Sequence, residues 1–429
     1  MSSDFNASLL QFLDNSPTPF HAVSSLAERF VAAGFTRLED GESWSLQKGE
    51  SYFVTRNDSA IVAFHYGKQS LVDHGVRVAG AHTDSPCLKL KPAPVIAKKG
   101  YVQLGVEVYG GALLYPWFDR DLSLAGRVDF ACADGQLHSA LVDARAPIAF
   151  IPSLAIHLDR LANEGRKINP QTEMAPIVQL GAEGEKFDFD AFILGLVKDA
   201  GVEPTTLLSH ELMFYDTQPA ALVGLHQEFL ASARLDNLLS CFLCAESLIG
   251  CEDEYTSIVV CNDHEEVGSV STSGAQGPFL KAVIERLLLA ESASADGFDR
   301  LASHSAMLSI DNAHGVHPSF ADRHDDSHGP QLNAGPVIKI NANQRYASNS
   351  HSVAQFKHYC AKAGVETQSF AMRADMACGS TIGPITSASL GIETVDVGVP
   401  TFGMHSIREL AGSDDAQSMA KAVSAFFSR

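Results

Sequence analysis

Short apolar runs alternate with helix-like segments along much of this chain, and this alternation constrains the fold more than any other feature. Residues 258–261 (Ile-Val-Val-Cys) carry no polar side chain, as expected of a strand that is buried on both faces. Helical segments at 237–249 and 279–290 flank this run. Strands that are joined through helices run parallel and are covered on both faces. We therefore predict an α/β fold, with a mostly parallel sheet and helices on both faces.

The same rhythm places further elements. We expect strands at 76–81, 307–310 and 394–399, an N-terminal helix around 23–31, and a final helix from about Ser413. Hydrophobic residues make up 45% of the chain, which is enough to bury such a sheet between helices.

The middle third of the chain has a different pattern. Apolar residues alternate with other residues over 102–108, which is typical of half-buried strands, and irregular Gly/Pro-rich stretches lie nearby. A chain of 429 residues is also too long for one ordinary hydrophobic core. We therefore predict a discontinuous α/β domain at 1–92 and 230–429, interrupted at 93–229 by an inserted β-rich domain.

Net charge and cysteine usage limit the partners and the compartment. The 31 basic and 51 acidic residues give a formal charge of −20 (31 − 51), which disfavours nucleic acids and anionic membranes as partners. No apolar run approaches the ~20 residues that cross a bilayer, and no secretory signal is visible at the N-terminus. The eight cysteines are scattered, so we expect reduced thiols and a cytoplasmic protein.

Two adjacent carboxylates, Glu265 and Glu266, follow the apolar run at 258–261. Near the end of a buried strand, such a pair is costly to desolvate unless a positive charge holds it. In extended chain the two side chains point to opposite sides, so that one can bind a metal ion while the other stays free as a base. The alternative is a solvated acidic turn, and the rest of the chain decides between the two.

Other residues with metal-ligand chemistry fall at the ends of predicted strands or, in one case, at the start of a helix. The set comprises His82, Asp84, Asp236, Asp311 and His405. Sites in open α/β sheets form beyond the carboxyl ends of the strands, so these side chains can converge. Together with the Glu pair they suit two borderline divalent cations such as Zn²⁺, bridged by one carboxylate. Taken singly, each residue is also compatible with a core histidine or a helix-capping aspartate.

Several longer motifs resemble the signatures of the aspartyl aminopeptidase family of cocatalytic zinc exopeptidases. Three of them hold the residues above: 82–86 (His-Thr-Asp-Ser-Pro), 262–269 (Asn-Asp-His-Glu-Glu-Val-Gly-Ser) and 403–409 (Gly-Met-His-Ser-Ile-Arg-Glu). The resemblance extends along nearly the whole chain, through 16–21, 151–157, 311–314, 335–339 and 378–384. One departure is Asp263-His264, directly before the Glu pair, which could place an extra titratable group near the base.

The resemblance implies a role for each metal-ligand candidate. Asp236 would bridge two divalent ions, most simply Zn²⁺. His82 and Asp311 would complete one ion site, while Glu266 and His405 would complete the other. The fold would be that of the zinc exopeptidases, and the resemblance also implies a large homo-oligomer, a dodecamer.

The catalytic roles follow from the same resemblance. Asp84 would accept a hydrogen bond from the second ring nitrogen of His82, and Glu265 would be the general base and acid that acts on the metal-bridging water. The implied substrates are peptides with N-terminal Asp or Glu. Candidate substrate-binding residues are His157, His314, Lys339, Arg345, Arg373, Gly379, Ser380 and Arg408.

Two other functions fit the same metal site. One is a cocatalytic metal amidohydrolase or deacylase that acts on N-acyl amino acids. The other is a non-catalytic assembly protein that keeps the metal ions for structure. The free carboxylate of Glu265 argues against the second, because a structural site needs no base beside its ligands.

Overall fold

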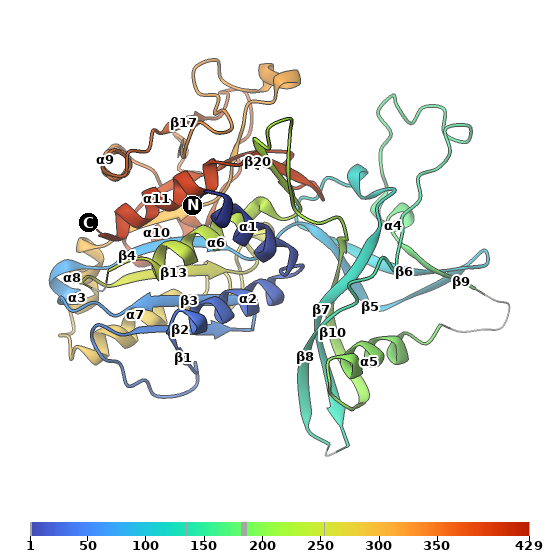
Figure 1. Cartoon of the computed structure of the whole chain (residues 1–429), viewed down its shortest axis with the longest axis horizontal. Coiled ribbons are helices and arrows are strands. Elements are labelled where there is room, and N and C mark those ends of the chain that lie inside the picture. Colours follow the sequence, from blue (N-terminus) through green and yellow to red (C-terminus); the bar gives the residue numbers. More distant parts are fainter. Residues whose placement is uncertain (1, 134, 182–186, 253, 429) are drawn as a thin grey trace. The chain divides into compact units, whose positions relative to one another are not determined.

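The chain divides into two structural units, which are described here one at a time (Figure 1). The computed structural model describes residues 2–133, 135–181, 187–252 and 254–428. The first unit consists of Met1–Asp84, Ala220–Met404 and Glu409–Arg429, and the second of Ser85–Pro219 and His405–Arg408.

A nine-stranded mixed sheet forms the centre of the first unit, in the order β1-β2-β3-β13-β4-β14-β18-β16-β17. Its strands are β1 (Thr36–Leu38), β2 (Ser51–Arg56), β3 (Ala60–His65), β4 (Arg77–His82), β13 (Ser257–Asn262), β14 (Ala306–Ile310), β16 (Val337–Ile340), β17 (Gln368–Ala371) and β18 (Glu393–Gly398). The central strands β13, β4, β14 and β18 are parallel, while β3 and β16 are antiparallel to their neighbours β13 and β18. The carboxyl ends of the central strands therefore share one edge of the sheet.

Apolar residues on the two faces of this sheet belong to two separate cores. Val259 and Cys261 pack into one core, whereas Ile258 and Val260 pack into the other, as the two-residue period of a strand requires. The first core takes helices α1 (Ser2–Asp14), α2 (Pro19–Ala32), α6 (Leu235–Ile249), α9 (Ser350–Lys362) and α11 (Asp415–Ser428). The second takes α3 (Leu71–His74), α7 (Phe279–Ala290), α8 (Gly297–His304) and α10 (Ile382–Leu390). The predicted α/β class with helices on both faces is confirmed.

A smaller sheet of five strands also lies in the first unit, in the order β11-β12-β20-β19-β15. Its strands are β11 (Ala221–Val223), β12 (Phe229–Ser232), β15 (Ala313–His314), β19 (Pro400–Phe402) and β20 (Glu409–Gly412). Since β15 begins just after β14, and β19 just after β18, this sheet continues the carboxyl-end edge of the large sheet. Two 3-10 helices, η2 (Glu265–Val267) and η3 (Pro318–Arg323), lie in the loops that follow β13 and β15.

The second unit is built on an antiparallel sheet in the order β8-β7-β10-β5-β6-β9. Its elements are β5 (Cys87–Lys98), β6 (Tyr101–Tyr109), η1 (Tyr115–Trp117), β7 (Leu122–Cys132), β8 (Leu137–Asp143), α4 (Pro170–Glu173), β9 (Ile177–Leu180), α5 (Phe189–Asp199) and β10 (Pro204–Asp216). Helix α5 packs its buried face, Phe189, Ile193 and Val197, into the apolar core of this sheet.

The elements predicted from periodicity lie close to those observed. The predicted helix 279–290 matches α7, and the strands predicted at 76–81, 307–310 and 394–399 differ by one residue at one or both ends from β4, β14 and β18. The predicted domain boundaries at 93 and 230 fall inside β5 and β12. The alternation of apolar residues is the same on both sides of the point at which the chain passes from one unit to the other, so it does not mark that point. Within the described ranges, no helix has the length and apolar content needed to cross a membrane.

Candidate metal centre

Three residues that could hold a metal ion converge at the carboxyl-end edge of the large sheet. His82 is the last residue of β4, Glu266 lies in η2 just beyond β13, and Asp236 lies in the first turn of α6. Each offers one ligand atom, and the three atoms all lie within 4.8 Å of one another. Asp311, directly after β14, joins this cluster because its Oδ1 is 3.6 Å from His82 Nε2.

The spacing of these atoms fits a zinc ion. Ligand atoms held at about 2.0–2.2 Å from one tetrahedral zinc lie roughly 3.3–3.6 Å apart. His82 Nε2 is 3.5 Å from Asp236 Oδ1 and 3.6 Å from Asp311 Oδ1, and all three side chains are largely shielded from solvent. One imidazole with several carboxylates is also a donor set that zinc accepts. The residues present therefore fit the metal that the sequence predicts.

The backbone around Asp236 is held from two directions. Its backbone N–H donates to Glu409 Oε2 at 2.9 Å. The side-chain amide of the next residue, Asn237, donates to the carbonyl of Ile310 at 2.9 Å. Asp236 and Asn237 do not have helical backbone angles, although they lie within the bounds of α6, and the peptide bond between them is cis. Glu409, a buried residue of β20, had no role in the sequence reading.

Asp84 connects His82 to the Glu pair. Its carboxylate accepts from the backbone N–H of Glu265 at 3.1 Å and of Glu266 at 3.0 Å. The same carboxylate lies 3.3 Å from His82 Nδ1, and the main-chain carbonyl of Asp84 lies 3.0 Å from that nitrogen. One buried side chain thereby fixes the positions of a metal-ligand candidate and of the candidate base.

The Glu pair is not extended. Its two side chains therefore do not point to opposite sides in the way that the sequence predicted for a strand. Glu265 and Glu266 begin η2, and the residue before them, His264, has a left-handed backbone with φ of 63°. The His264 Nδ1 and Ser271 Oγ atoms are hydrogen-bonded at 2.9 Å. The backbone N–H of His264 donates to Asp263 Oδ1 at 2.7 Å. Asp263 and His264, the departure from the family motif, therefore shape the turn that presents the pair.

The carboxylates alter the proton affinities of their neighbours. Burial raises the pKa of Glu265 to about 7; the positive charge of His82 opposes this rise, and Asp311, Asp236 and Asp84 add to it. Burial alone would lower the pKa of His82, but its bonds to Asp236, Asp311 and Asp84 raise that pKa well above its ordinary value. A carboxyl that titrates near neutral pH is suited to general acid–base work.

Lys339 is buried beside the metal cluster. Its Nζ lies 3.2 Å from Asp311 Oδ2 and 3.2 Å from the carbonyl of Asn312. The ammonium also lies 5.2 Å from the centre of the Tyr346 ring, and the Tyr346 hydroxyl interacts with the Cys378 thiol. These contacts link the metal cluster to two loops. One contains the candidate Arg345, and the other contains the candidates Gly379 and Ser380.

Those two loops are joined to each other. Ser380 Oγ donates to the carbonyl of Arg345 at 3.1 Å, so Arg345, Gly379 and Ser380 gather in one place. The guanidinium of Arg345 is exposed and has no carboxylate within ion-pair distance in the described part of the chain. Arg373, in contrast, pairs with Asp375 through two bonds of 2.9 and 2.7 Å.

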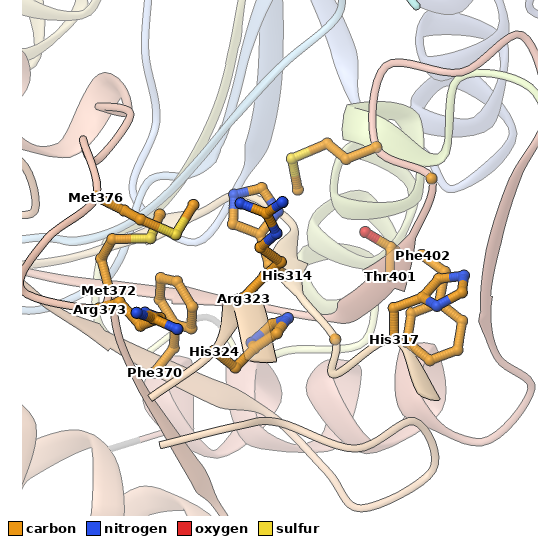
Figure 2. Close-up of a pocket in the computed structure, with 13 residues that line it drawn as sticks. His314, His317, Arg323, His324, Phe370, Met372, Arg373, Met376, Thr401 and Phe402 are labelled. Carbon is orange, nitrogen blue, oxygen red and sulfur yellow. The ribbon is translucent and has the colours of Figure 1, made fainter. Parts of the chain in front are cut away.

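The remaining candidates belong to other segments of the two units. Three of them belong to the second unit. His405 Nδ1 is 3.1 Å from the carbonyl of Gly111, and Arg408 donates to the carbonyl of Pro219 at 3.1 Å. His157 is exposed in the loop after residue 151. His314 and Arg373 line a pocket of about 270 Å³ in the first unit, together with aromatic and methionine side chains (Figure 2). The sequence reading missed this pocket, because its walls come from β15, η3, β17 and β19.

Sequence and structure comparisons agree on one family. The family profile described as "Aminopeptidase I zinc metalloprotease (M18)" matches residues 12–427. The chain is 55% identical, over 428 residues, to a "Probable M18 family aminopeptidase 2" of Pseudomonas savastanoi pv. phaseolicola, covering 100% of this chain and 99% of that relative.

Solved structures give the same answer. One is the cryo-EM structure of the Ape4 and Nbr1 complex, with a TM-score of 0.95 and 39% identity over 99% of this chain and 86% of that one. Another is the S. cerevisiae mApe1 dodecamer, with a TM-score of 0.87 and 28% identity over 99% of this chain and 96% of that one. Together with the clustered zinc-ligand side chains, these matches show that the chain belongs to the M18 family of zinc metalloproteases and is an aminopeptidase.

Proposed function

We propose that this aminopeptidase releases N-terminal Asp and Glu from peptides and holds two zinc ions per subunit. The observation that carries the proposal is the convergence of His82, Asp236, Glu266 and Asp311 beside a carboxyl, Glu265, whose pKa is raised to about 7. The acidic preference rests on the resemblance of the motifs to aspartyl aminopeptidases and on the cations described below.

The proposed ligand set follows the sequence reading. Asp236 would be shared by the two ions, His82 and Asp311 would help to hold one of them, and Glu266 and His405 would help to hold the other. Zinc in such sites supplies a Lewis acid that polarises the scissile carbonyl. Asp84 supports the arrangement, because its carboxylate orients both His82 and the backbone of Glu266.

Glu265 is proposed to move the proton. It is not assigned as a ligand, and its backbone is fixed by Asp84, so its carboxylate stays available to take a proton from the attacking water and deliver it to the leaving amine. Burial raises the pKa of Glu265 to about 7 before any metal ion binds, and a carboxyl whose pKa lies above its ordinary value takes up a proton more readily as a base.

The acidic side chain of the substrate is proposed to face Arg345. This guanidinium is exposed, is unpaired with any described carboxylate, and is connected through Ser380 and Tyr346 to Lys339 beside the metal cluster. A free cation is needed, because the net charge of −20 repels an acidic peptide at long range. We further propose a homo-oligomer, as in the dodecameric mApe1 relative, and a cytoplasmic location that suits its eight free cysteines.

The proposal is tested with a panel of aminoacyl arylamides and purified, zinc-loaded protein. We expect release from Asp and Glu, and much slower release from Asn, which matches Asp in shape without its charge. Equal release from Asp, Asn and Leu would contradict the acidic preference.

Two other outcomes point to the alternatives. Turnover of N-acetylated but not of free amino acid amides would indicate an amidohydrolase. No turnover by protein that holds two zinc ions per chain, measured by elemental analysis, would indicate an assembly protein.

A further inference from the structure

The pocket that contains His314 lies directly beside the candidate metal centre. His314 ends β15, three residues after Asp311, and pairs in register with Thr401 of β19. His314 lines the pocket and is close enough to Asp236 and Asp311 for their charges to act on its ring, so this wall of the pocket lies near the metal cluster. A substrate whose scissile bond is at the metal centre therefore has part of its chain next to this pocket.

The lining of the pocket is mainly aromatic and sulfur-containing. Phe370, Phe402, Met372 and Met376 contribute apolar surface, and imidazoles pack edge-on or tilted against the phenyl rings (Figure 2). The His314 ring centre lies 5.7 Å from that of Phe370, and the His317 ring centre lies 5.5 Å from that of Phe402. At about 270 Å³, the pocket is smaller than the ~300–1,000 Å³ that takes drug-sized molecules, so its size suits one amino-acid side chain.

The two guanidiniums of the pocket already have carboxylate neighbours. Arg373 is held by Asp375, and Arg323 has Asp322 at 3.8 Å. Burial lowers the pKa of His324, which favours its neutral imidazole. An acidic side chain would lose its hydration here without gaining an unpaired cation.

A polar atom in the pocket lacks a protein partner. His324 Nδ1 is shielded from solvent and forms no hydrogen bond with any described residue. A buried ring nitrogen of this kind is costly unless a ligand or water completes it. A backbone N–H or C=O of a bound peptide supplies such a partner.

We propose that this pocket holds the side chain of the second residue of the peptide, the first residue of the leaving product, and selects apolar side chains such as Leu, Met and Phe. The inference rests on the proposed function, in which the first residue is acidic and is recognised by Arg345. The carboxylate of an acidic side chain would lose its hydration in the pocket without gaining an unpaired cation. An apolar side chain instead gains from burial against Phe402 and the methionines.

The test measures kcat/KM for a series of Asp-Xaa amides with the zinc-loaded protein. We expect Leu at the second position to exceed Gly by about tenfold or more, since burial of one apolar side chain discriminates on that scale. The variants Phe402→Ala and Met376→Ala should each lower this Leu/Gly ratio at least about threefold. Met376→Lys should shift the Glu/Leu ratio at the second position towards Glu by about threefold.

Phe320→Ala is the matched control. Phe320 is 57% exposed and lies 5.0 Å from His317, ring centre to ring centre, but it does not line the pocket. We expect this variant to keep the wild-type Leu/Gly ratio.

The outcomes separate the inference from the proposed function. Equal rates for all second residues, or variants that alter selectivity for the first residue instead, would overturn the assignment of the pocket. If Asp and Glu prove not to be preferred at the first position, the same series on the preferred first residue still tests the pocket.

Discussion

At the scale of single residues, the candidate metal centre holds protons that a metal ion must displace. In the metal-free protein His82 is charged at neutral pH, because Asp236, Asp311 and Asp84 raise its pKa well above 6.5. Glu265, with a pKa of about 7, is partly protonated at the same pH. A cation at this place favours the deprotonated form of both groups, so metal binding and proton release are linked.

We therefore predict that zinc binding at pH 7 releases about one to two protons per chain. Since both pKa values are raised in the metal-free protein, apparent zinc affinity should fall as pH is lowered from 8 to 6. Calorimetric titration in two buffers of different ionisation enthalpy measures the number of protons. Zinc binding without proton release would contradict the protonation states described for His82 and Glu265.

A second prediction concerns the base itself. Glu265→Gln should retain zinc, because this residue is not a proposed ligand, and should lose about 10²–10⁴-fold in kcat. Glu266→Gln is the adjacent control and should lose zinc. Elemental analysis and steady-state kinetics on both variants decide the matter. An active Glu265→Gln protein would remove Glu265 from the proposed chemistry.

At the scale of elements, one buried carboxylate ties together the segments around the candidate substrate site. Asp396 of β18 accepts from Ser309 Oγ of β14 at 2.7 Å, from Thr381 Oγ1 before α10 at 2.5 Å, and from the N–H of Ala347 at 2.6 Å. Burial raises its pKa, and the charge of Lys339 opposes that rise. The loop that contains Arg345 is thus anchored to the sheet by its neighbour Ala347.

Loss of this anchor should weaken both the fold and the site. Asp396→Ala leaves two buried hydroxyls and one partly buried N–H without an acceptor, and we expect it to lower the free energy of unfolding by about 3 kcal/mol or more. Urea denaturation measures the change. Asp375→Ala removes an exposed ion pair with Arg373 and should cost less than about 1 kcal/mol. Equal stability of the two variants would show that the Asp396 contacts are not important for the fold.

At the scale of the whole molecule, the second unit presents apolar side chains to solvent in one short stretch. Leu154, Ile156, Leu158 and Leu161 are 49%, 49%, 75% and 64% exposed, and His157 lies among them. Clustered exposed apolar side chains are typical of protein interfaces. This stretch is our candidate for a subunit contact, through which His157 would reach a neighbouring subunit.

We predict that Leu158→Asp reduces or abolishes assembly of the homo-oligomer, since it places a charge in an apolar contact. Leu289→Asp is the control, because Leu289 of α7 is similarly exposed, at 77%, but belongs to the first unit. Light scattering after size-exclusion chromatography gives the mass of each variant. A wild-type mass for Leu158→Asp would place the interface elsewhere.

The elements and most of the metal cluster follow from local patterns in the sequence. A fully apolar run such as 258–261 specifies a strand buried on both faces, and a polar residue that ends such a run marks the edge where sites form. For this reason the positions of His82, Asp311 and the Glu265-Glu266 pair marked them as candidates, while the choice of Glu266 as a ligand came from the family resemblance. These residues end or follow β4, β13 and β14, which are parallel neighbours in the sheet, and the pairing of these strands brings the residues together.

The contacts among distant segments were not predictable in this way. Nothing local indicates that Glu409 accepts from Asp236, or that Asp396 holds the loop before α9, because both contacts join residues far apart in sequence. The 3-10 turn of the Glu pair depends on Asp84, which lies about 180 residues earlier.

By itself, the sequence determined the α/β class and the placement of polar residues with metal-ligand chemistry at the ends of strands, since hydrophobic periodicity and residue chemistry are local properties. The ligand and base roles of Glu266 and Glu265 stay predictions that the family resemblance implies. Only the tertiary structure decided which cations remain free and which walls enclose a pocket. Arg345 and Arg373 look alike in the sequence, yet Asp375 neutralises one and no described carboxylate pairs with the other. Charge neutralisation and cavity shape depend on distances between side chains, and folding sets those distances.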